Sequence, residues 1–307
     1  MKLKFDAAAG NRSQPDPFIF EDNGRFYLYV TAGAGVEAYS APDPFGEWKY
    51  EGIVGTVEGG QNFWAPSIVK YEGKYYIYVS CDLEGVFEHM QVMESDSPLG
   101  PFGNAKKLYD EFSIDSHVVE TADGLFLWYA KDNRDTDRIG TRVYVDRLLD
   151  PYTPENKPVE KIVPTFDEEI FMRNRFGDGK DWHTIEGAFW FEHEGWQYVM
   201  YSGACYQNDT YHIGYASAKT DETDLTKVDY TKHTDGGKFD PVMTKNDWEE
   251  GVGHHSVLFY GGEFYAVYHG RDAIDDGSIH GDRRTARICK LCVKDGIITA
   301  ERYEDRV

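Results

Sequence analysis

The chain has 307 residues, and its 32 basic and 54 acidic residues give it a net charge of −22. This acidic excess argues against nucleic acid or an anionic membrane surface as a partner, because both require a basic face. No segment approaches the roughly 20 consecutive apolar residues that a transmembrane helix needs. Aromatic residues make up 15% of the chain, and aromatic residues favour β-strands.

The first ten residues are expected to form a strap that leads into the first strand. They contain no apolar stretch long enough for a signal peptide, so we expect a cytoplasmic protein. A secreted protein is the alternative if the natural chain begins further upstream. The four cysteines are expected to be free and mostly buried thiols: Cys81, Cys205, Cys289 and Cys292.

Residues 15–29 are predicted to form a β-hairpin. Its two strands flank Asn23-Gly24, and both of these residues tolerate the positive φ that a type I′ turn requires. The same pattern of an apolar strand, a turn with glycine and an aromatic-rich strand recurs over residues 64–78, 115–129, 186–201 and 254–268. Five copies of one hairpin therefore run through the chain.

The spacing of these hairpins predicts a β-propeller. The opening residues are 16, 64, 115, 186 and 254, which gives spacings of 48, 51, 71 and 68 residues. A turn-rich segment at residues 40–46 is echoed at 95–103 and 149–154, so each repeat holds about four strands. Units of four strands at intervals of roughly 40–50 residues are typical of propeller blades.

The two longer spacings leave room for surface insertions. We expect these insertions over residues 166–183 and 220–252, which are rich in charged residues and glycine. Nothing in the sequence resembles a linker between domains. The prediction is therefore one all-β domain over residues 1–307, a five-bladed β-propeller with four antiparallel strands in each blade.

The residues that open the five hairpins indicate where a site would lie. They are Asp16, Trp64, Asp115, Glu186 and His254. The first strand of each propeller blade lines the central channel, so these side chains should converge at one end of the axis. Each could instead cap its own turn, as Asp often does. Three buried carboxylates at equivalent positions are costly unless they are paired, so they favour a functional site or a bound cation.

Paired carboxylates suit the hydrolysis of glycosidic bonds. One carboxyl group donates a proton, and a second, ionised one activates water or attacks the sugar. A third carboxylate nearby can keep the acid protonated, because like charges resist ionising together. The rings of Phe63, Trp64 and Trp182 could contact the C–H faces of a sugar, although core packing is the alternative for each of them.

The motifs around these residues resemble those of the family 43 glycoside hydrolases. The resemblance covers nearly the whole chain and rests on Pro15-Asp16-Pro17, Phe63-Trp64-Ala65-Pro66-Ser67, Ile114-Asp115, Thr184-Ile185-Glu186-Gly187 and Gly253-His254-His255-Ser256-Val257. It implies a five-bladed propeller that cleaves arabinofuranosides or xylosides with inversion. It also implies that Asp16 is the general base, that Asp115 tunes the acid, and that Glu186 is the general acid. Many members have a proline after the second carboxylate, where this chain has Ser116-His117.

The resemblance implies binding residues as well. His254 matches a histidine that helps to hold a water-coordinated calcium ion, and His255 beside it is expected to contact the substrate. Arg284 matches an arginine that reaches the sugar at the cleavage site, with Arg283 as the alternative register. No organic cofactor is implied. The expected partner is a small oligosaccharide, and the oligomeric state stays open.

The expected activity is that of an exo-acting α-L-arabinofuranosidase on short arabinose-containing oligosaccharides. The chain ends at Val307 without the C-terminal β-sandwich of the larger family β-xylosidases, which disfavours that activity. The missing signal peptide disfavours an endo-acting enzyme on polymeric arabinan. A β-D-xylosidase or another exo-glycosidase of the family is the first alternative. A carbohydrate-binding propeller without catalysis is the second, although it would need neither an acid nor a base.

Overall fold

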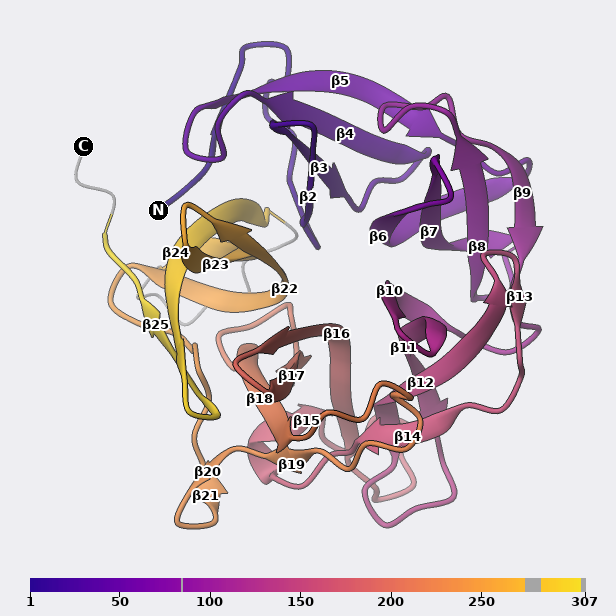
Figure 1. The fold of residues 1–307 in the computed structure, drawn as a ribbon. Helices are drawn as coiled ribbons and strands as arrows, with labels where there is room; N and C mark the ends of the chain where they lie inside the picture. Colours follow the sequence, from indigo (N-terminus) through magenta and orange to yellow (C-terminus); the bar gives the residue numbers. More distant parts are fainter. Residues whose placement is uncertain (84, 274–282, 305–307) are drawn as a thin grey trace.

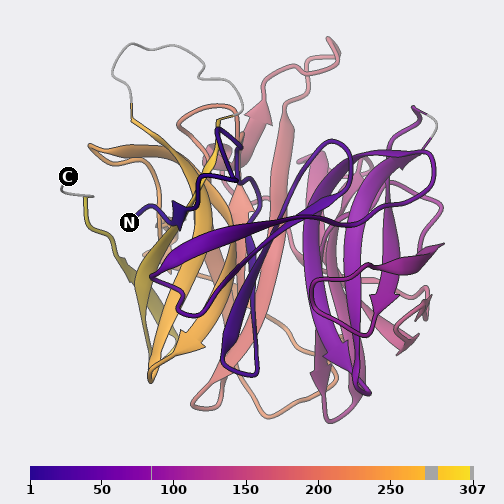
Figure 2. The same ribbon diagram turned by 90° about the horizontal axis from the view of Figure 1, so that it is seen from above.

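The computed structural model describes residues 1–83, 85–273 and 283–304. Its longer strands form five antiparallel units of four strands, which surround a central axis (Figure 1). The first strand of each unit lies nearest the axis (Figure 1), and the view turned by 90° shows the inner strands running roughly along the axis (Figure 2). This pairing agrees with the five-bladed propeller expected from the sequence.

The blades follow one another along the chain. From the axis outward, blade 1 consists of β2 (Phe18–Asp22), β3 (Arg25–Val30), β4 (Val36–Ala41) and β5 (Glu47–Gly55). Blade 2 consists of β6 (Gly60–Tyr71), β7 (Lys74–Leu83), β8 (Glu88–Ser95) and β9 (Gly103–Lys107). Blade 3 consists of β10 (Ile114–Thr121), β11 (Gly124–Asn133), β12 (Gly140–Asp150) and β14 (Val159–Ile162), with the short β13 (Thr153–Pro154) also paired to β12. Blade 4 consists of β16 (Trp182–His193), β17 (Trp196–Gly203), β18 (His212–Lys219) and β19 (Thr231–Lys232). Blade 5 consists of β22 (Glu249–Tyr260), β23 (Glu263–Asp272), β24 (Thr285–Lys294) and β25 (Ile297–Glu301).

The hydrophobic core is divided among the gaps between blades. Each of the five apolar clusters draws its side chains from two neighbouring blades. Large aromatic residues fill these clusters, among them Trp48, Trp128, Tyr198 and Tyr268, all of which are fully buried. The high aromatic content therefore serves mainly to pack blade against blade.

The N-terminal strap joins the first blade to the last. The strand β1 (Lys4–Phe5) pairs in parallel with β5, and the backbone of Met1 and Leu3 hydrogen-bonds to Ile288 and Ala286 of β24. Because β5 and β24 belong to blades 1 and 5, the first residues close the ring.

The two expected insertions pack against each other beside blade 4. The first contains a short 3₁₀ helix, η1 (Asp167–Glu169), and β15 (Ile170–Met172), and the second contains β20 (Thr234–Asp235) and β21 (Lys238–Phe239). The ammonium of Lys232 contacts Glu169 and donates to the carbonyl of Val163 at 2.9 Å. The prediction of plain surface loops is wrong for the second insertion, since residues 231–232 supply the outer strand of blade 4.

All four cysteines are free, and Cys292 alone among them is exposed. Within the described part of the chain, no helix is long and apolar enough to cross a membrane.

Candidate active site

A cavity of about 530 Å³ opens on the axis at one end of the ring, and every blade contributes to its wall. Its lining includes the three predicted catalytic residues, Asp16, Asp115 and Glu186, together with Trp64, Trp182, His254 and Arg284. The remaining lining residues are Thr31, Asn62, Glu88, Phe112, Ile114, Asp132, Thr141, Phe171, Arg175, Thr184 and Tyr206. The structure therefore brings most of the predicted site residues together.

A repeated backbone irregularity turns these side chains toward the axis. In each blade a residue within the inner strand or just before it has a backbone in the left-handed region: Asp16 (φ 53°), Ala65 (φ 45°), Asp115 (φ 62°), Gly187 (φ 59°) and His254 (φ 45°). In blades 2 to 5 the register of the inner hairpin shifts at this residue, as in a β-bulge. Bulges re-aim side chains and often occur beside active sites.

This geometry corrects one part of the predicted repeat. The residues at the bulges of blades 2 and 4 are Ala65 and Gly187, so Trp64 and Glu186 lie one residue earlier than Asp16, Asp115 and His254. Glu186 still pairs with Ser202 of β17 before the register shifts. Glu186 and the two aspartates therefore enter the cavity from different backbone positions.

Asp16 is held as an anion. Its carboxylate accepts hydrogen bonds from the hydroxyl of Thr31 at 2.5 Å and from Nη1 of Arg284 at 3.0 Å. Its backbone N–H donates to Nδ1 of His269 at 3.1 Å. Burial alone would raise the pKa of Asp16, but the Arg284 charge and the neighbouring His254 and His269 hold it well below its usual range.

Asp115 is in the opposite electrostatic situation. It is 5% exposed, and burial, followed by the negative charges of Glu186 and Asp16, raises its pKa well above the usual range. Its Oδ2 accepts the backbone N–H of Gly187 at 3.1 Å. The left-handed residues of blades 1, 2 and 5 likewise donate their backbone N–H to a side chain of the preceding blade. The acceptors are His269 for blade 1, Thr31 for blade 2 and Ser202 for blade 5. Asp115 takes this role in blade 4, where the residue at the corresponding place, Ala130, has no acceptor in its side chain.

Glu186 is placed to hold a proton near neutral pH. Burial raises its pKa to about 7, even though the hydrogen bond from the Tyr211 hydroxyl, 2.7 Å from Oε1, works in the other direction. The negative charge of Asp16 adds to the rise. At neutral pH the cavity thus contains an ionised carboxylate, Asp16, and a carboxyl group that is still partly protonated, Glu186.

His254 lies between the carboxyl groups. Its Nδ1 is 3.4 Å from Oδ1 of Asp16, and its Nε2 is 4.0 Å from Oδ1 of Asp115. Burial lowers the pKa of His254, so the ring is neutral at physiological pH. The ring also packs over Gly187, where an added Cβ would come within 3.3 Å of it.

The expected calcium ion does not fit these residues well. Potential ligand atoms of Asp115, Glu186 and His254 lie within 4.8 Å of one another, which could bring three donors to a cation. Calcium takes roughly six to eight oxygen ligands, and burial favours the protonated form of both carboxyl groups here. Asp115 and His254 also line a cavity of about 20 Å³, which has room for about one water molecule, whereas all three residues line the larger cavity of about 530 Å³.

The structure contradicts two of the predicted binding residues. Phe63 is fully buried in the cluster between blades 1 and 2, because neighbouring strand residues face opposite sides and Trp64 takes the cavity side. His255 follows the bulge of blade 5 and lines the small axial cavity beneath the site instead of the main one. Trp182 lines the main cavity, although it is almost fully buried. Of the two arginines considered, Arg284 contacts Asp16, and Arg283 is exposed.

Several site residues were missed from the sequence. Thr31 and His269 contact Asp16, and both occupy the position after the aromatic strand of their hairpin, where Ser202 stands in blade 4. Extending the hairpin comparison by two residues would have found them. Tyr211 and Arg175 lie outside the repeat, and no motif pointed to either.

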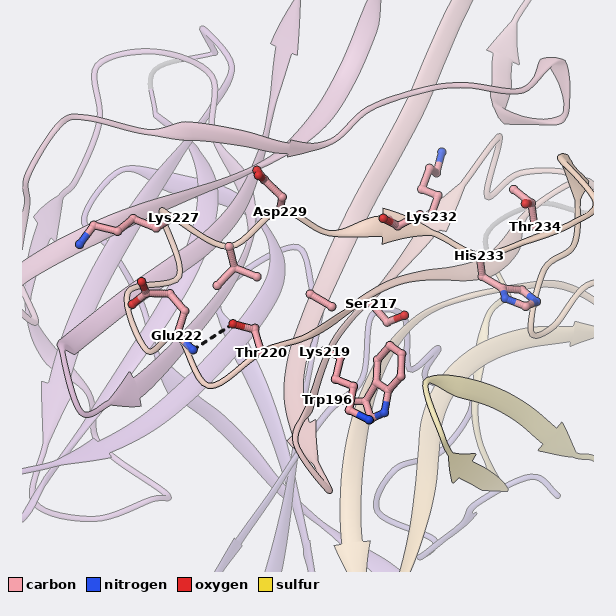
Figure 3. A pocket seen from close by; sticks show the side chains of 13 residues that line it. Trp196, Ser217, Lys219, Thr220, Glu222, Lys227, Asp229, Lys232, His233 and Thr234 are labelled. Atoms are coloured by element: carbon pink, nitrogen blue, oxygen red, sulfur yellow. Dashed lines mark hydrogen bonds between the residues drawn. The ribbon is translucent and has the colours of Figure 1, made fainter.

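A larger hollow of about 740 Å³ lies on blade 4, away from the axis (Figure 3). It is lined by Trp196, Ser217, Lys219, Thr220, Glu222, Lys227, Asp229, Lys232, His233 and Thr234, among others, and the backbone N–H of Glu222 donates to the Thr220 hydroxyl there (Figure 3). The lining brings no two carboxyl groups with opposite pKa shifts together. The chemistry is therefore assigned to the smaller cavity on the axis.

Comparison with known proteins gives a consistent result. A family model described as "Glycosyl hydrolases family 43" matches residues 8–298. The chain is 27% identical to "Xylosidase/arabinosidase 43A" of Humicola insolens, over 93% of this chain and 89% of that protein. It is 26% identical to "Extracellular exo-alpha-(1->5)-L-arabinofuranosidase" of Streptomyces avermitilis, over 73% of this chain and 45% of that protein. The solved structure of "a thermostable family-43 glycoside hydrolase" superposes with a TM-score of 0.80 at 30% identity, covering 96% of this chain and 95% of that one. The match across almost the entire propeller shows that the chain belongs to glycosyl hydrolase family 43 and is a glycoside hydrolase.

Proposed function

We propose that this protein is an inverting, exo-acting α-L-arabinofuranosidase that releases arabinose from short arabinose-containing oligosaccharides. The observation that carries the proposal is the opposite pKa shift of two carboxyl groups in one cavity. Asp16 is ionised and Glu186 holds its proton up to a pH of about 7. An ionised base and a protonated acid are the two groups that hydrolysis of a glycosidic bond requires.

In this mechanism Asp16 acts on water and Glu186 acts on the leaving group. Asp16 removes a proton from a water molecule that attacks the anomeric carbon on the face opposite the leaving group. Glu186 gives its proton to the departing glycosidic oxygen. Arg284 and Thr31 keep Asp16 ionised and oriented through their hydrogen bonds. Calcium forms no part of the mechanism.

The exo mode is supported by the shape of the site. Residues of all five blades surround the cavity, and Phe171 and Arg175 of the first insertion add to its wall. A cavity to which every blade and the first insertion contribute suits the end of a sugar chain better than its middle. The arabinoside preference is supported by two relatives, whose names include arabinosidase or arabinofuranosidase.

A β-D-xylosidase is the second candidate, because the name of the Humicola insolens relative covers both activities. Rates on aryl α-L-arabinofuranoside, aryl β-D-xyloside and aryl galactoside substrates decide between them. We expect the highest kcat/KM on the arabinofuranoside. A preference for the xyloside would replace the substrate in the proposal and leave the acid–base assignment intact.

Two variants test the acid–base assignment. Glu186→Gln should reduce turnover of arabinobiose by about 10²–10⁴-fold and affect dinitrophenyl arabinofuranoside much less, because a good leaving group departs without protonation. Asp16→Asn should abolish turnover of both substrates. Proton NMR of the first product should show the anomer opposite to that of the substrate. Retention of configuration, or an Asp16→Asn enzyme with normal rates, would contradict the assignment.

A further inference from the structure

We propose that Tyr211 is a positioning residue for the general acid: its hydroxyl group donates a hydrogen bond to Oε1 of Glu186 and so keeps the transferable proton on Oε2. The inference rests on the proposed role of Glu186 as the acid. It concerns which of the two carboxyl oxygens delivers the proton.

The hydrogen bond between the two side chains has one favourable direction. The Tyr211 hydroxyl lies 2.7 Å from Oε1 of Glu186. If Glu186 carried its proton on Oε1 and donated to the phenol, the phenolic hydrogen would need another acceptor. Among the described residues, the Tyr211 hydroxyl has no second hydrogen-bond partner. Tyr211 therefore donates, and the proton of Glu186 resides on the other oxygen.

The tyrosine ring is fixed from two sides. Tyr211 is fully buried directly before β18, and its ring stacks on His269 with the centroids 5.6 Å apart and the planes at 7°. On another side it lies against Gly253, where an added Cβ would be 2.0 Å from Cε1 of Tyr211. A glycine directly before the blade 5 bulge thus makes room for the ring.

The stack also connects the acid to the base. His269 accepts the backbone N–H of Asp16 at 3.1 Å, and its Nδ1 is 3.2 Å from the Asp16 carboxylate. Tyr211 therefore bridges Glu186 and the ring that supports Asp16. Moving the phenol would disturb the direction in which the acid points relative to the base.

The phenol stays a donor at every working pH. Burial, followed by the negative charge of Glu186, raises the pKa of Tyr211 well above its usual range. The other charged and titratable groups around Glu186 include Asp16, Asp115, Asp132, Cys205, His254 and Arg284. Of these, Arg284 is the cation that, like the phenol, favours the ionised form of Glu186.

Replacement of Tyr211 by Phe removes the donor and keeps the ring. We expect kcat on arabinobiose to fall by about 10- to 100-fold, while turnover of dinitrophenyl arabinofuranoside changes by less than about threefold. The alkaline limb of the pH profile should move up by about one pH unit, because the phenol no longer stabilises the ionised acid. A role in folding alone would lower both rates equally and leave the pH profile unchanged.

Tyr109→Phe is the matched control. Tyr109 is also buried, and its hydroxyl donates to a buried carboxylate, Asp146, at 3.1 Å, but it lies between blades 2 and 3 outside the cavity. This variant should keep the wild-type leaving-group dependence and pH profile even if its melting temperature falls.

Incorporation of 3-fluorotyrosine at position 211 tests the same idea if the Phe variant does not fold. A more acidic phenol donates a stronger hydrogen bond, so the alkaline limb should move to lower pH. If the folded Phe and 3-fluorotyrosine variants keep the wild-type pH profile of kcat and the wild-type dependence on the leaving group, the proposed role of Tyr211 is wrong. The Glu186→Gln comparison reports separately on the proposed function, since it fails only if Glu186 is not the acid.

Discussion

At the scale of single residues, Asp16 and Glu186 carry the same functional group, yet their surroundings give them opposite charge states. Asp16 has Arg284, Thr31 and His269 around it, whereas Glu186 has one phenol. Burial acts on both in the same direction, toward the protonated form. The number of donors and cations facing each group therefore decides which becomes the base.

This difference predicts opposite effects on stability. The pKa of Asp16 is lowered by folding, so its contribution is present above its ordinary value of 3.8 and is lost as the pH falls through the lower folded value. Asp16→Asn should therefore destabilise the protein at pH 7, by roughly 3 kcal/mol, because Arg284 loses its buried partner. The pKa of Glu186 is raised from 4.5 to about 7, so stability is lost as the pH rises between these values. Glu186→Gln should then stabilise the protein at pH 8 by about 1–3 kcal/mol and have little effect at pH 4.

Thermal unfolding of the wild type and both variants from pH 4 to pH 8 measures these effects. Asp16→Asn should lie below the wild type by a nearly constant amount over this range, whereas Glu186→Gln should start close to the wild type at pH 4 and become the more stable protein as the pH rises. A Glu186→Gln protein that is less stable than the wild type at pH 8 would contradict the raised pKa.

The three carboxyl groups of the cavity were predictable from the sequence, but the direction of other side chains was not. Asp16, Asp115 and Glu186 open hairpins that repeat, and three acidic residues at such places are hard to explain as structure. Phe63 and His255 stand beside site residues in the same motifs, yet both point away from the cavity. Which of two adjacent residues faces the axis depends on the bulge, and its backbone angles leave no clear mark in one sequence.

At the scale of elements, the inner hairpins were predictable because their alternation, turns and aromatic residues all favour strands. The left-handed residue of each inner strand, which forms a bulge in blades 2 to 5, was not predictable, since aspartate, alanine, glycine and histidine occupy this position in different blades. Holding non-glycine residues there costs about 1–3 kcal/mol each, and the hydrogen bonds that their backbone N–H groups donate to side chains of the preceding blade stabilise the conformation. The site is thus built from the contacts between blades.

The first insertion adds a wall of aromatic residues and arginine to the cavity. The Arg175 guanidinium lies 4.9 Å from the ring centroid of Trp182 and 5.1 Å from that of Phe171. It lines the cavity, and within the described part of the chain it forms no ion pair with Asp16, Asp115 or Glu186, so it can bind sugar without taking part in the chemistry. Arg175→Ala should raise KM for arabinose oligosaccharides about three- to tenfold and leave kcat within about twofold.

Arg173→Ala is the control for this prediction. Arg173 belongs to the same segment, is exposed, and pairs with Asp181 at 2.7 Å, but it does not line the cavity. Steady-state kinetics of both variants on an oligosaccharide should separate them. Equal KM values for Arg175→Ala and Arg173→Ala would show that the wall does not contact the substrate.

At the scale of the whole molecule, the ring has to be held closed for the bulges to meet at the axis. Blades 3 and 4 are joined by a short parallel pairing of β12 with β16, and blades 1 and 5 by the N-terminal strap. Both Arg284 and the strand that pairs with the strap belong to the same stretch of blade 5. The strap therefore hydrogen-bonds to Ala286, two residues after Arg284, which keeps Asp16 ionised.

Leu3 tests the contribution of the strap to this closure. It is 7% exposed in the cluster between blades 1 and 5, and its backbone N–H donates to Ala286 at 2.9 Å. Leu3→Ala should destabilise the protein by roughly 2–4 kcal/mol and lower the melting temperature by about 3–6 °C, because it leaves a cavity between the two blades. The neighbouring Lys4→Ala, which removes an exposed side chain, should change the melting temperature by less than about 2 °C.

Well below its melting temperature the Leu3→Ala enzyme should keep the wild-type kcat and pH profile, since the backbone hydrogen bonds of the strap remain. A melting temperature equal to that of Lys4→Ala would show that the strap does not hold the ring closed, whereas a shifted acid limb would show that loosening it reaches Arg284 and Asp16.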